Sequence, residues 1–119
     1  MVSKEQIREA LWEIPAGWEQ AFGDTLVDEL YEAAIADGMD DDWCILQMKE
    51  KFGELCVYPN WYGDHIEAVI DKYEKISRRT CVLCGEPATC ISLGWVSPYC
   101  DACMEKHGGD SVAIDEFLL

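Results

Sequence analysis

Cys81-Val-Leu-Cys84 and Cys100-Asp-Ala-Cys103 are the two stretches of sequence that decide the fold of this chain. The spacing between the two pairs brings four thiolates to the corners of a tetrahedron, the geometry that a structural zinc ion prefers. A site with four cysteine ligands is coordinatively full, so it contributes folding energy but leaves no position for an activated water. The motifs therefore predict a zinc-stabilised module and argue against metal catalysis.

The residues around these motifs support the same interpretation. Gly85 allows a tight turn after the first pair, which points backbone N–H groups at the sulfurs. The segment between the pairs is long enough for the short strands of a zinc ribbon, with Trp95 and Tyr99 expected to pack it. An iron–sulfur cluster also uses four thiolates, but zinc is the commoner occupant of paired CxxC motifs. His107 is a candidate substitute ligand, although a surface histidine is the simpler interpretation.

The composition describes an acidic protein with enough apolar residues to form a core. The chain has 119 residues, of which 50% are hydrophobic, and its formal net charge is -15. Such a chain repels nucleic acid and anionic membranes, so its expected partners are basic surfaces. We find no signal peptide and no apolar run long enough to span a bilayer, and the 7 cysteines, an odd number, indicate a reducing cytoplasm. The three cysteines outside the motifs are expected to be small buried hydrophobic residues: Cys44, Cys56 and Cys90.

Apolar periodicity predicts three helices in the first two thirds of the chain. A capping-box pattern at Ser3 opens a helix that continues to about Glu13. A longer helix is expected over residues 18–37, with Gly38 as the left-handed residue that ends it. A third helix follows Pro59 and carries an apolar stripe made of Ile66, Val69, Ile70, Tyr73 and Ile76.

Residues 43–58 fit two different structures. An alternating pattern places Cys44, Leu46 and Met48 on one face, and Leu55 and Val57 continue it beyond a turn near Phe52-Gly53. This pattern favours a β-hairpin, while a helix that ends at Gly53 is the alternative.

The sequence thus predicts an α+β protein that combines a small helical body, a β-hairpin and a C-terminal four-cysteine zinc-ribbon module. The acidic helical body covers residues 1–79, and the zinc-ribbon module with its tail covers residues 80–119. The two parts are expected to pack as one unit. The tail is expected to form a short helix that docks Phe117 and Leu118.

Two strings of residues together resemble a family of small phage and prophage proteins. The first is Lys49-Glu-Lys-Phe-Gly53-Glu-Leu-Cys-Val-Tyr58, and the second joins Cys81-x-x-Cys84-Gly85 to Gly94-Trp95-Val96 and Tyr99-Cys100-Asp101. The likeness covers roughly residues 43 to 104. The family has no assigned enzymatic activity, so the resemblance implies a phage-associated origin, and the cytoplasm of a bacterial host as the location.

The chain departs from this family at two positions. Cys56 stands where the family commonly has arginine, which weakens any inherited basic contact. Cys103 stands where the final ligand is often histidine, which leaves zinc binding intact.

The first functional hypothesis is a non-enzymatic interaction protein that blocks a basic, nucleic-acid-binding surface on a host protein, in the manner of an anti-CRISPR inhibitor. The hypothesis rests on the negative charge of the chain, because carboxylates on rigid helices can imitate an array of phosphates. The candidate partner-binding residues are Glu13, Asp24, Asp28, Glu29, Glu32, Asp40, Asp41 and Asp42, and the candidate aromatic anchors are Trp12, Trp18 and Trp61. The structural alternative is an ordinary solvated acidic face.

The second hypothesis is a transcription-associated or nucleic-acid-binding zinc ribbon, whose phosphate contacts would come from Lys72, Lys75, Arg78 and Arg79. A zinc-dependent enzyme is a weaker third hypothesis. The sequence contains no nucleophile–base arrangement, no phosphate loop and no HExxH motif, so we expect no enzymatic activity.

Overall fold

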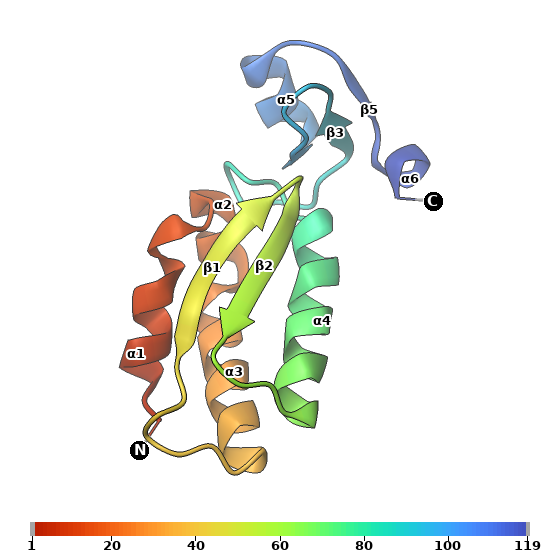
Figure 1. The fold of residues 1–119 in the computed structure, drawn as a ribbon. Coiled ribbons are helices and arrows are strands. Elements are labelled where there is room, and N and C mark those ends of the chain that lie inside the picture. The colour runs from red at the N-terminus through yellow and green to blue at the C-terminus, as the bar shows by residue number, and fades with distance from the viewer. Residues whose placement is uncertain (1, 119) are drawn as a thin grey trace.

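A computed structural model describes residues 2–118 and shows an α+β fold, as predicted. A two-stranded antiparallel hairpin lies on a layer of helices, and a smaller module that carries the cysteine pairs lies at one end (Figure 1). The described residues include no helix that is both long and apolar enough to cross a membrane.

The first helix begins where the capping pattern predicts it. Helix α1 covers Lys4–Glu9, and the backbone N–H of Gln6 donates to Ser3 Oγ over 3.3 Å. The chain then tightens into the 3-10 helix η1, Ala10–Glu13, and Ile14 ends it in an extended conformation before Pro15. Proline favours an extended residue before it, which explains this end point.

The long second helix is confirmed, with one irregular turn that the periodicity does not reveal. Helix α2 covers Ala16–Trp18, a π-helical turn η2 covers Glu19–Gly23, and helix α3 covers Asp24–Ala36. Gly38 follows with a φ of 74°, which is the left-handed cap expected from the sequence.

The hairpin is also confirmed, and the helical alternative for residues 43–58 is wrong. Strand β1 covers Ile45–Lys51 and pairs with β2, Glu54–Pro59. The register shifts between Ile45 and Gln47, and this irregularity leaves Leu46 67% exposed, on the opposite face from that predicted. Beyond the shift the alternation holds, because the facing pair Met48 and Val57 is buried against the helices.

Helix α4 covers Asp64–Arg78, and its N-terminus is capped by a residue from another helix. The Asp37 carboxylate, just after α3, accepts hydrogen bonds from the backbone N–H groups of His65 (3.1 Å) and Ile66 (2.8 Å). His65 Nδ1 lies 2.7 Å from the same carboxylate and adds a side-chain contact to the cap. The predicted stripe on α4 holds at Ile66 and Tyr73 but not at Ile76, which is 38% exposed.

The core of the body lies between the helices and the inner face of the hairpin. Burying one such large apolar side chain stabilises the fold by about 1.5–3 kcal/mol. The fully buried side chains include Ile7, Leu11, Trp18, Leu26, Leu30, Met48, Leu55 and Ile66.

The C-terminal module is built from a cysteine turn, a small sheet and a helix. Strand β3, Cys90–Ser92, lies between β4, Pro98–Tyr99, and β5, Ser111–Ala113, and helix α5 covers Asp101–His107. The short strands of the predicted ribbon are present, but the second cysteine pair lies at the start of a helix and not in a second turn. The third strand was not predicted.

The predicted short helix of the tail is α6, Ile114–Phe117. Ile114 is its buried residue, while Phe117 is 44% exposed and Leu118 is half-buried. The docking role predicted for Phe117 therefore belongs to Ile114. Leu119 lies outside the described residues.

Body and module interlock at the cysteine turn. The backbone N–H of Gly17 donates to Val82 O over 2.9 Å, and Trp18 Nε1 donates to Thr80 O over 2.8 Å. A Cβ atom on Gly17 would lie 2.4 Å from Cys81 O, so only glycine allows this close approach.

Candidate metal centre

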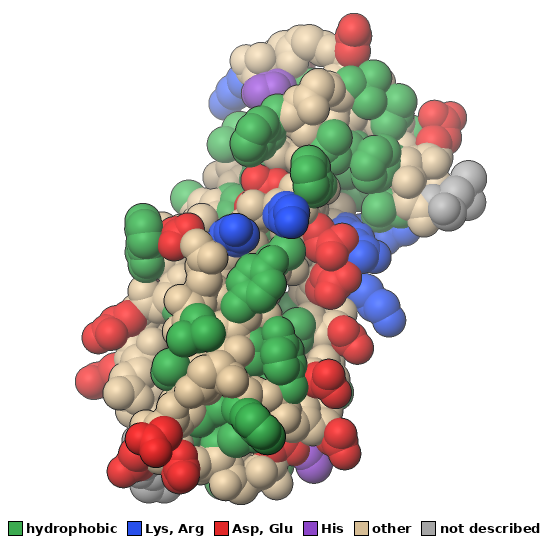
Figure 2. All heavy atoms as spheres, in the orientation of Figure 1, with side chains coloured by type: hydrophobic (Ala, Val, Ile, Leu, Met, Phe, Trp, Pro, Cys, Tyr) green, Lys and Arg blue, Asp and Glu red, His purple; other side chains and the backbone are tan. Residues whose placement is uncertain are grey.

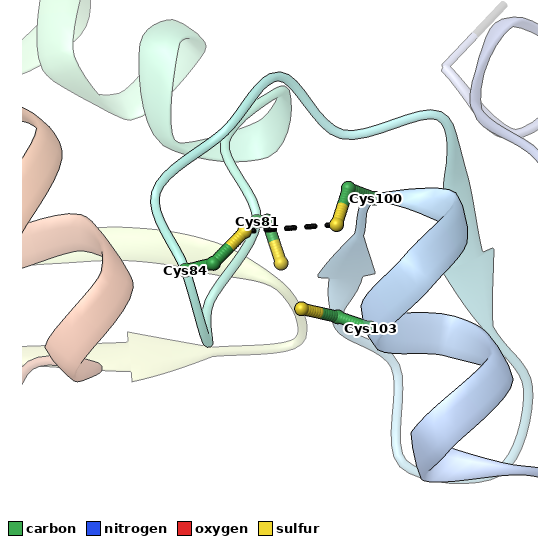
Figure 3. A group of neighbouring side chains, drawn as sticks. All are labelled: Cys81, Cys84, Cys100 and Cys103. Atoms are coloured by element: carbon green, nitrogen blue, oxygen red, sulfur yellow. Dashed lines mark hydrogen bonds between the residues drawn. The ribbon is translucent and has the colours of Figure 1, made fainter.

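Two different local structures present the four thiols. Cys81 and Cys84 flank a turn that Gly85 completes with a φ of 82°, and the backbone N–H of Gly85 donates to Cys81 O over 3.1 Å. Cys100 is the N-cap residue of α5, and Cys103 lies in the first turn of that helix. The turn and the helix start face each other, so residues far apart in the sequence meet (Figure 3).

The distances between the sulfurs fit a tetrahedral metal ion. All four Sγ atoms lie within 4.8 Å of one another, and Cys84 Sγ is 3.6 Å from Cys100 Sγ. Four sulfurs at the usual Zn–S distance of about 2.3 Å from one centre are separated by about 3.8 Å. The four residues can therefore hold a metal ion, and the sequence-predicted set Cys81, Cys84, Cys100 and Cys103 is brought together as expected.

The electrostatics of the cluster also favour a cation. Burial acts to raise the pKa of Cys81, but backbone N–H groups of Cys100, Cys84 and Leu83 outweigh it and lower this pKa to about 7. The hydrogen bond from Cys103 to Cys100, together with desolvation, raises the pKa of Cys103 to about 12. Four thiols this close cannot all ionise unless a positive charge joins them, whereas a divalent metal ion removes this conflict.

The chemistry available to this centre is structural. Four thiolates complete the coordination of a tetrahedral ion such as zinc, so no position is left for a substrate or a water. His107 does not join the cluster, since its ring stacks on Tyr99 with 4.8 Å between the ring centroids. The alternative ligand considered from the sequence is therefore a surface histidine.

The aromatic residues of the module differ in their roles. Tyr99 is buried, as predicted, but Trp95 is 76% exposed and does not pack the sheet. Trp18, proposed from the sequence as an exposed anchor, is fully buried in the core, whereas Trp12 and Trp61 are exposed. Among the remaining cysteines Cys90 is buried as expected, while the other two, Cys44 and Cys56, are half-buried.

The predicted partner-binding carboxylates fall into two groups. Three of them form ion pairs within the chain: Asp24 with Arg8 at 2.8 Å, Asp28 with Lys4 at 3.1 Å, and Glu29 with Lys72 at 2.7 Å.

The other candidates are Glu13, Glu32, Asp40, Asp41 and Asp42, and within residues 2–118 no ion pair is found for Glu13, Glu32, Asp40 or Asp42. Glu13 accepts hydrogen bonds from Gln47, and Asp40 accepts one from the backbone N–H of Asp42. Asp41 has an interaction within the chain as well. Glu32, Asp40 and Asp42 are exposed.

Most of the basic side chains proposed to contact phosphates already form ion pairs within the chain. Lys72 pairs with Glu29, Arg78 pairs with Glu54 at 2.7 Å and with Glu74 at 2.9 Å, and Arg79 pairs with Asp115 at 3.2 Å. Lys75 is the remaining member of that set. Phosphate binding would therefore have to break existing ion pairs at three of the four positions.

Sequence reasoning missed Gly17 and Asp37. Gly17 positions the cysteine turn on the body. The one feature of the sequence that pointed to this role is a glycine directly before a tryptophan at the start of a helix. Asp37 positions α4, and no spacing in the sequence identifies it as a cap for residues that far along the chain.

Comparison of the chain with models of protein families, with curated proteins and with solved structures finds no match. The resemblance to small phage proteins therefore stays a prediction.

Proposed function

We propose that this protein is a non-enzymatic binding protein, stabilised by zinc, that covers a basic, nucleic-acid-binding surface on another protein. The observation that carries the proposal is the separation of two features. A closed four-cysteine cluster lies where the body and the module join. Many exposed carboxylates lie away from it, on the body and its lower end (Figure 2).

One acidic hollow lies between η1 and β1. Glu9 and Glu13 line it together with Trp12, whose side chain is 80% exposed, and its volume is about 200 Å³. An exposed tryptophan beside two carboxylates suits a lysine or arginine side chain, because the ring adds a cation–π contact to the charge attraction.

A second acidic groove runs between α3 and α4. Its volume is about 470 Å³, small apolar residues such as Ala33 and Ala68 line it, and Glu29, Glu32 and His65 stand beside them. A shallow apolar floor with acidic residues beside it suits a basic helix or loop of a partner. Of the predicted binding residues, Glu13 lines the hollow and Glu32 lines the groove, while Asp40 and Asp42 add exposed carboxylates after α3.

The partner class follows from charge. A chain with a net charge of -15 is drawn to strongly basic proteins, and the strongest basic surfaces in a bacterial cell are those that bind nucleic acid. Within the phage resemblance, a CRISPR effector is such a target, so the proposed activity is inhibition of the anti-CRISPR type in the cytoplasm of a bacterial host.

The test is a plating assay on bacteria whose CRISPR system targets the infecting phage. Expression of the protein is expected to restore plaque formation, and a double variant with Glu13→Gln and Glu32→Gln is expected to lose most of this effect. The matched control is Glu105→Gln with Asp110→Asn, which removes two exposed carboxylates from the module.

Equal loss in both double variants would show that overall charge and not the proposed surface matters. No restoration against a panel of CRISPR types would overturn the anti-CRISPR assignment. Tight binding of bare duplex DNA at physiological salt would overturn the partner class itself.

A further inference from the structure

The outer face of the β1–β2 hairpin is unlike the rest of this acidic surface. We define the outer face as Leu46, Gln47, Lys49, Lys51, Phe52, Glu54, Cys56 and Tyr58. A solvated sheet face normally carries polar side chains, yet here Leu46 is 67%, Phe52 76% and Tyr58 38% exposed. Figure 2 shows apolar side chains and two basic ones gathered over this face.

The hairpin turn contains a residue that folding alone does not favour. Lys51 pairs with Glu54, so Phe52 and Gly53 form a two-residue turn, and both have positive φ values, 54° and 82°. Asn-Gly is the preferred pair in such a turn, because asparagine tolerates this conformation and a bulky side chain does not. Phe52 is strained and exposed, which is the combination found at functional sites.

The two lysines of the outer face are not neutralised by the carboxylate that shares this face of the hairpin. Glu54 lies opposite Lys51 but pairs with Arg78 at 2.7 Å. Lys49 lies 5.8 Å from the centroid of the Tyr58 ring, and Lys51 lies 6.0 Å from that of Phe52. Neither forms an ion pair within the part of the chain that the structure describes, although acids outnumber bases 24 to 9 in the sequence. Two positive charges over aromatic rings are thus left for an external anionic group.

The charges of the outer face also discriminate between its possible binding partners. A second copy that packed through the same face would place lysines against lysines, which opposes a symmetric dimer. A nucleic acid carries a negative charge at every phosphate, so two lysines would not offset its repulsion by a chain with a net charge of -15. A protein segment with only a few carboxylates meets much less of this repulsion. A protein surface that brings apolar side chains together with a few carboxylates matches both the rings and the lysines.

We propose that the outer face, with Phe52 as its anchor, binds a protein segment that carries apolar side chains and carboxylates. This surface meets the acidic hollow of the proposed function at Leu46 and Gln47, which line that hollow, but Phe52, Lys49 and Lys51 lie outside it and prefer the opposite charge. Each proposal can therefore fail without the other.

The test uses a random peptide display library as the probe, selected on the zinc-loaded protein. A variant that combines Phe52→Asn, Lys49→Ala and Lys51→Ala serves for counter-selection, because it retains the acidic surfaces and removes peptides that bind to them. We expect the surviving peptides to be rich in apolar residues and in Asp or Glu. Their affinity should fall at least tenfold with Phe52→Asn alone and stay unchanged with the control variant Lys106→Ala, whose exposed side chain lies in the C-terminal module.

Folding is monitored in the same variants. Asparagine suits the turn, so Phe52→Asn should raise the urea midpoint of unfolding while it weakens peptide binding at least tenfold. A loss of binding with a lower midpoint would mean that Phe52 serves the fold, and it would overturn the proposal.

Three further outcomes also overturn it. The first is a selection that leaves only basic peptides, or no peptides at all. The second is tighter binding of a single-stranded oligothymidylate probe than of any selected peptide. The third is a dimer, detected by light scattering, that Phe52→Asn converts to a monomer.

Discussion

Gly17 shows how one residue connects the two parts of the molecule. It lies at the start of the second helical segment, and its backbone N–H donates to Val82 O in the cysteine turn. Gly85 approaches from the other side, where an added Cβ would lie 2.7 Å from Gly17 O. Backbone therefore packs on backbone, which leaves no room for even a methyl group at either position.

Gly17→Ala is expected to destabilise the protein by about 1–3 kcal/mol, the usual result of forcing extra volume into a packed site. Urea unfolding monitored by circular dichroism measures the change. Gly23→Ala is the matched control, because its new methyl group would meet the flexible Glu19 side chain at 3.2 Å and Leu11 Cδ1 at an ordinary contact distance of 3.6 Å. A smaller loss at Gly17 than at Gly23 would contradict the account of the interlock.

At the scale of the element, helix α4 depends on a carboxylate outside itself. Its own N-cap, Gly63, has no side chain to offer, and a Cβ there would lie 2.3 Å from Asp37 Oδ2. Asp37 caps the helix from the end of α3, and this contact fixes the angle between the two helices. The hydrogen bonds occupy N–H groups that would otherwise have no partner within the helix.

The stability of this contact should depend on pH in a defined direction. Burial acts to raise the pKa of Asp37, but the N–H groups of Ile66 and His65 and the His65 ring lower it below its ordinary value. A carboxyl with a lowered pKa stabilises the folded state above its unfolded pKa, and this contribution disappears as the pH falls through the folded value. Thermal unfolding between neutral and acidic pH should show this loss.

Asp37→Asn is the control for that experiment, since asparagine keeps an acceptor oxygen but cannot titrate. The variant should be less stable than the wild type at neutral pH, and the difference should shrink in acid. A difference that stays constant across the pH range would exclude Asp37 as the source.

For the molecule as a whole, a metal ion held by the four cysteines would stabilise more than the module that carries them. A structural zinc in a small domain contributes on the order of 10 kcal/mol to folding. The cysteine turn is bonded to the body through Trp18 Nε1 and Gly17 N, so loss of its conformation removes partners from the core of the body.

Chelation of the metal is therefore expected to unfold the module, lower the melting temperature and shift the tryptophan fluorescence to longer wavelength as Trp18 becomes exposed. Circular dichroism, fluorescence and metal analysis by mass spectrometry measure these effects. Cys81→Ser with Cys100→Ser should reproduce them, while Cys44→Ser with Cys56→Ser should retain one equivalent of zinc. An unchanged melting temperature after complete metal removal would contradict a structural role.

The sequence by itself determined the elements whose signals are local. The paired CxxC spacing identified all four sulfurs, the period of the apolar residues predicted the helices, and Phe52-Gly53 marked the hairpin turn. Each of these signals depends on residues that interact with near neighbours or must share one face, so the information lies in the spacing.

Only the tertiary structure decided which charges remain available and how the parts join. The pairing of Asp24 with Arg8, the cap that Asp37 provides for α4 and the burial of Trp18 each join residues far apart in the sequence. The register shift in β1 likewise turned Leu46 outward. Such contacts depend on the relative placement of whole elements, which is set by the packing of the complete core and not by any local pattern of residues.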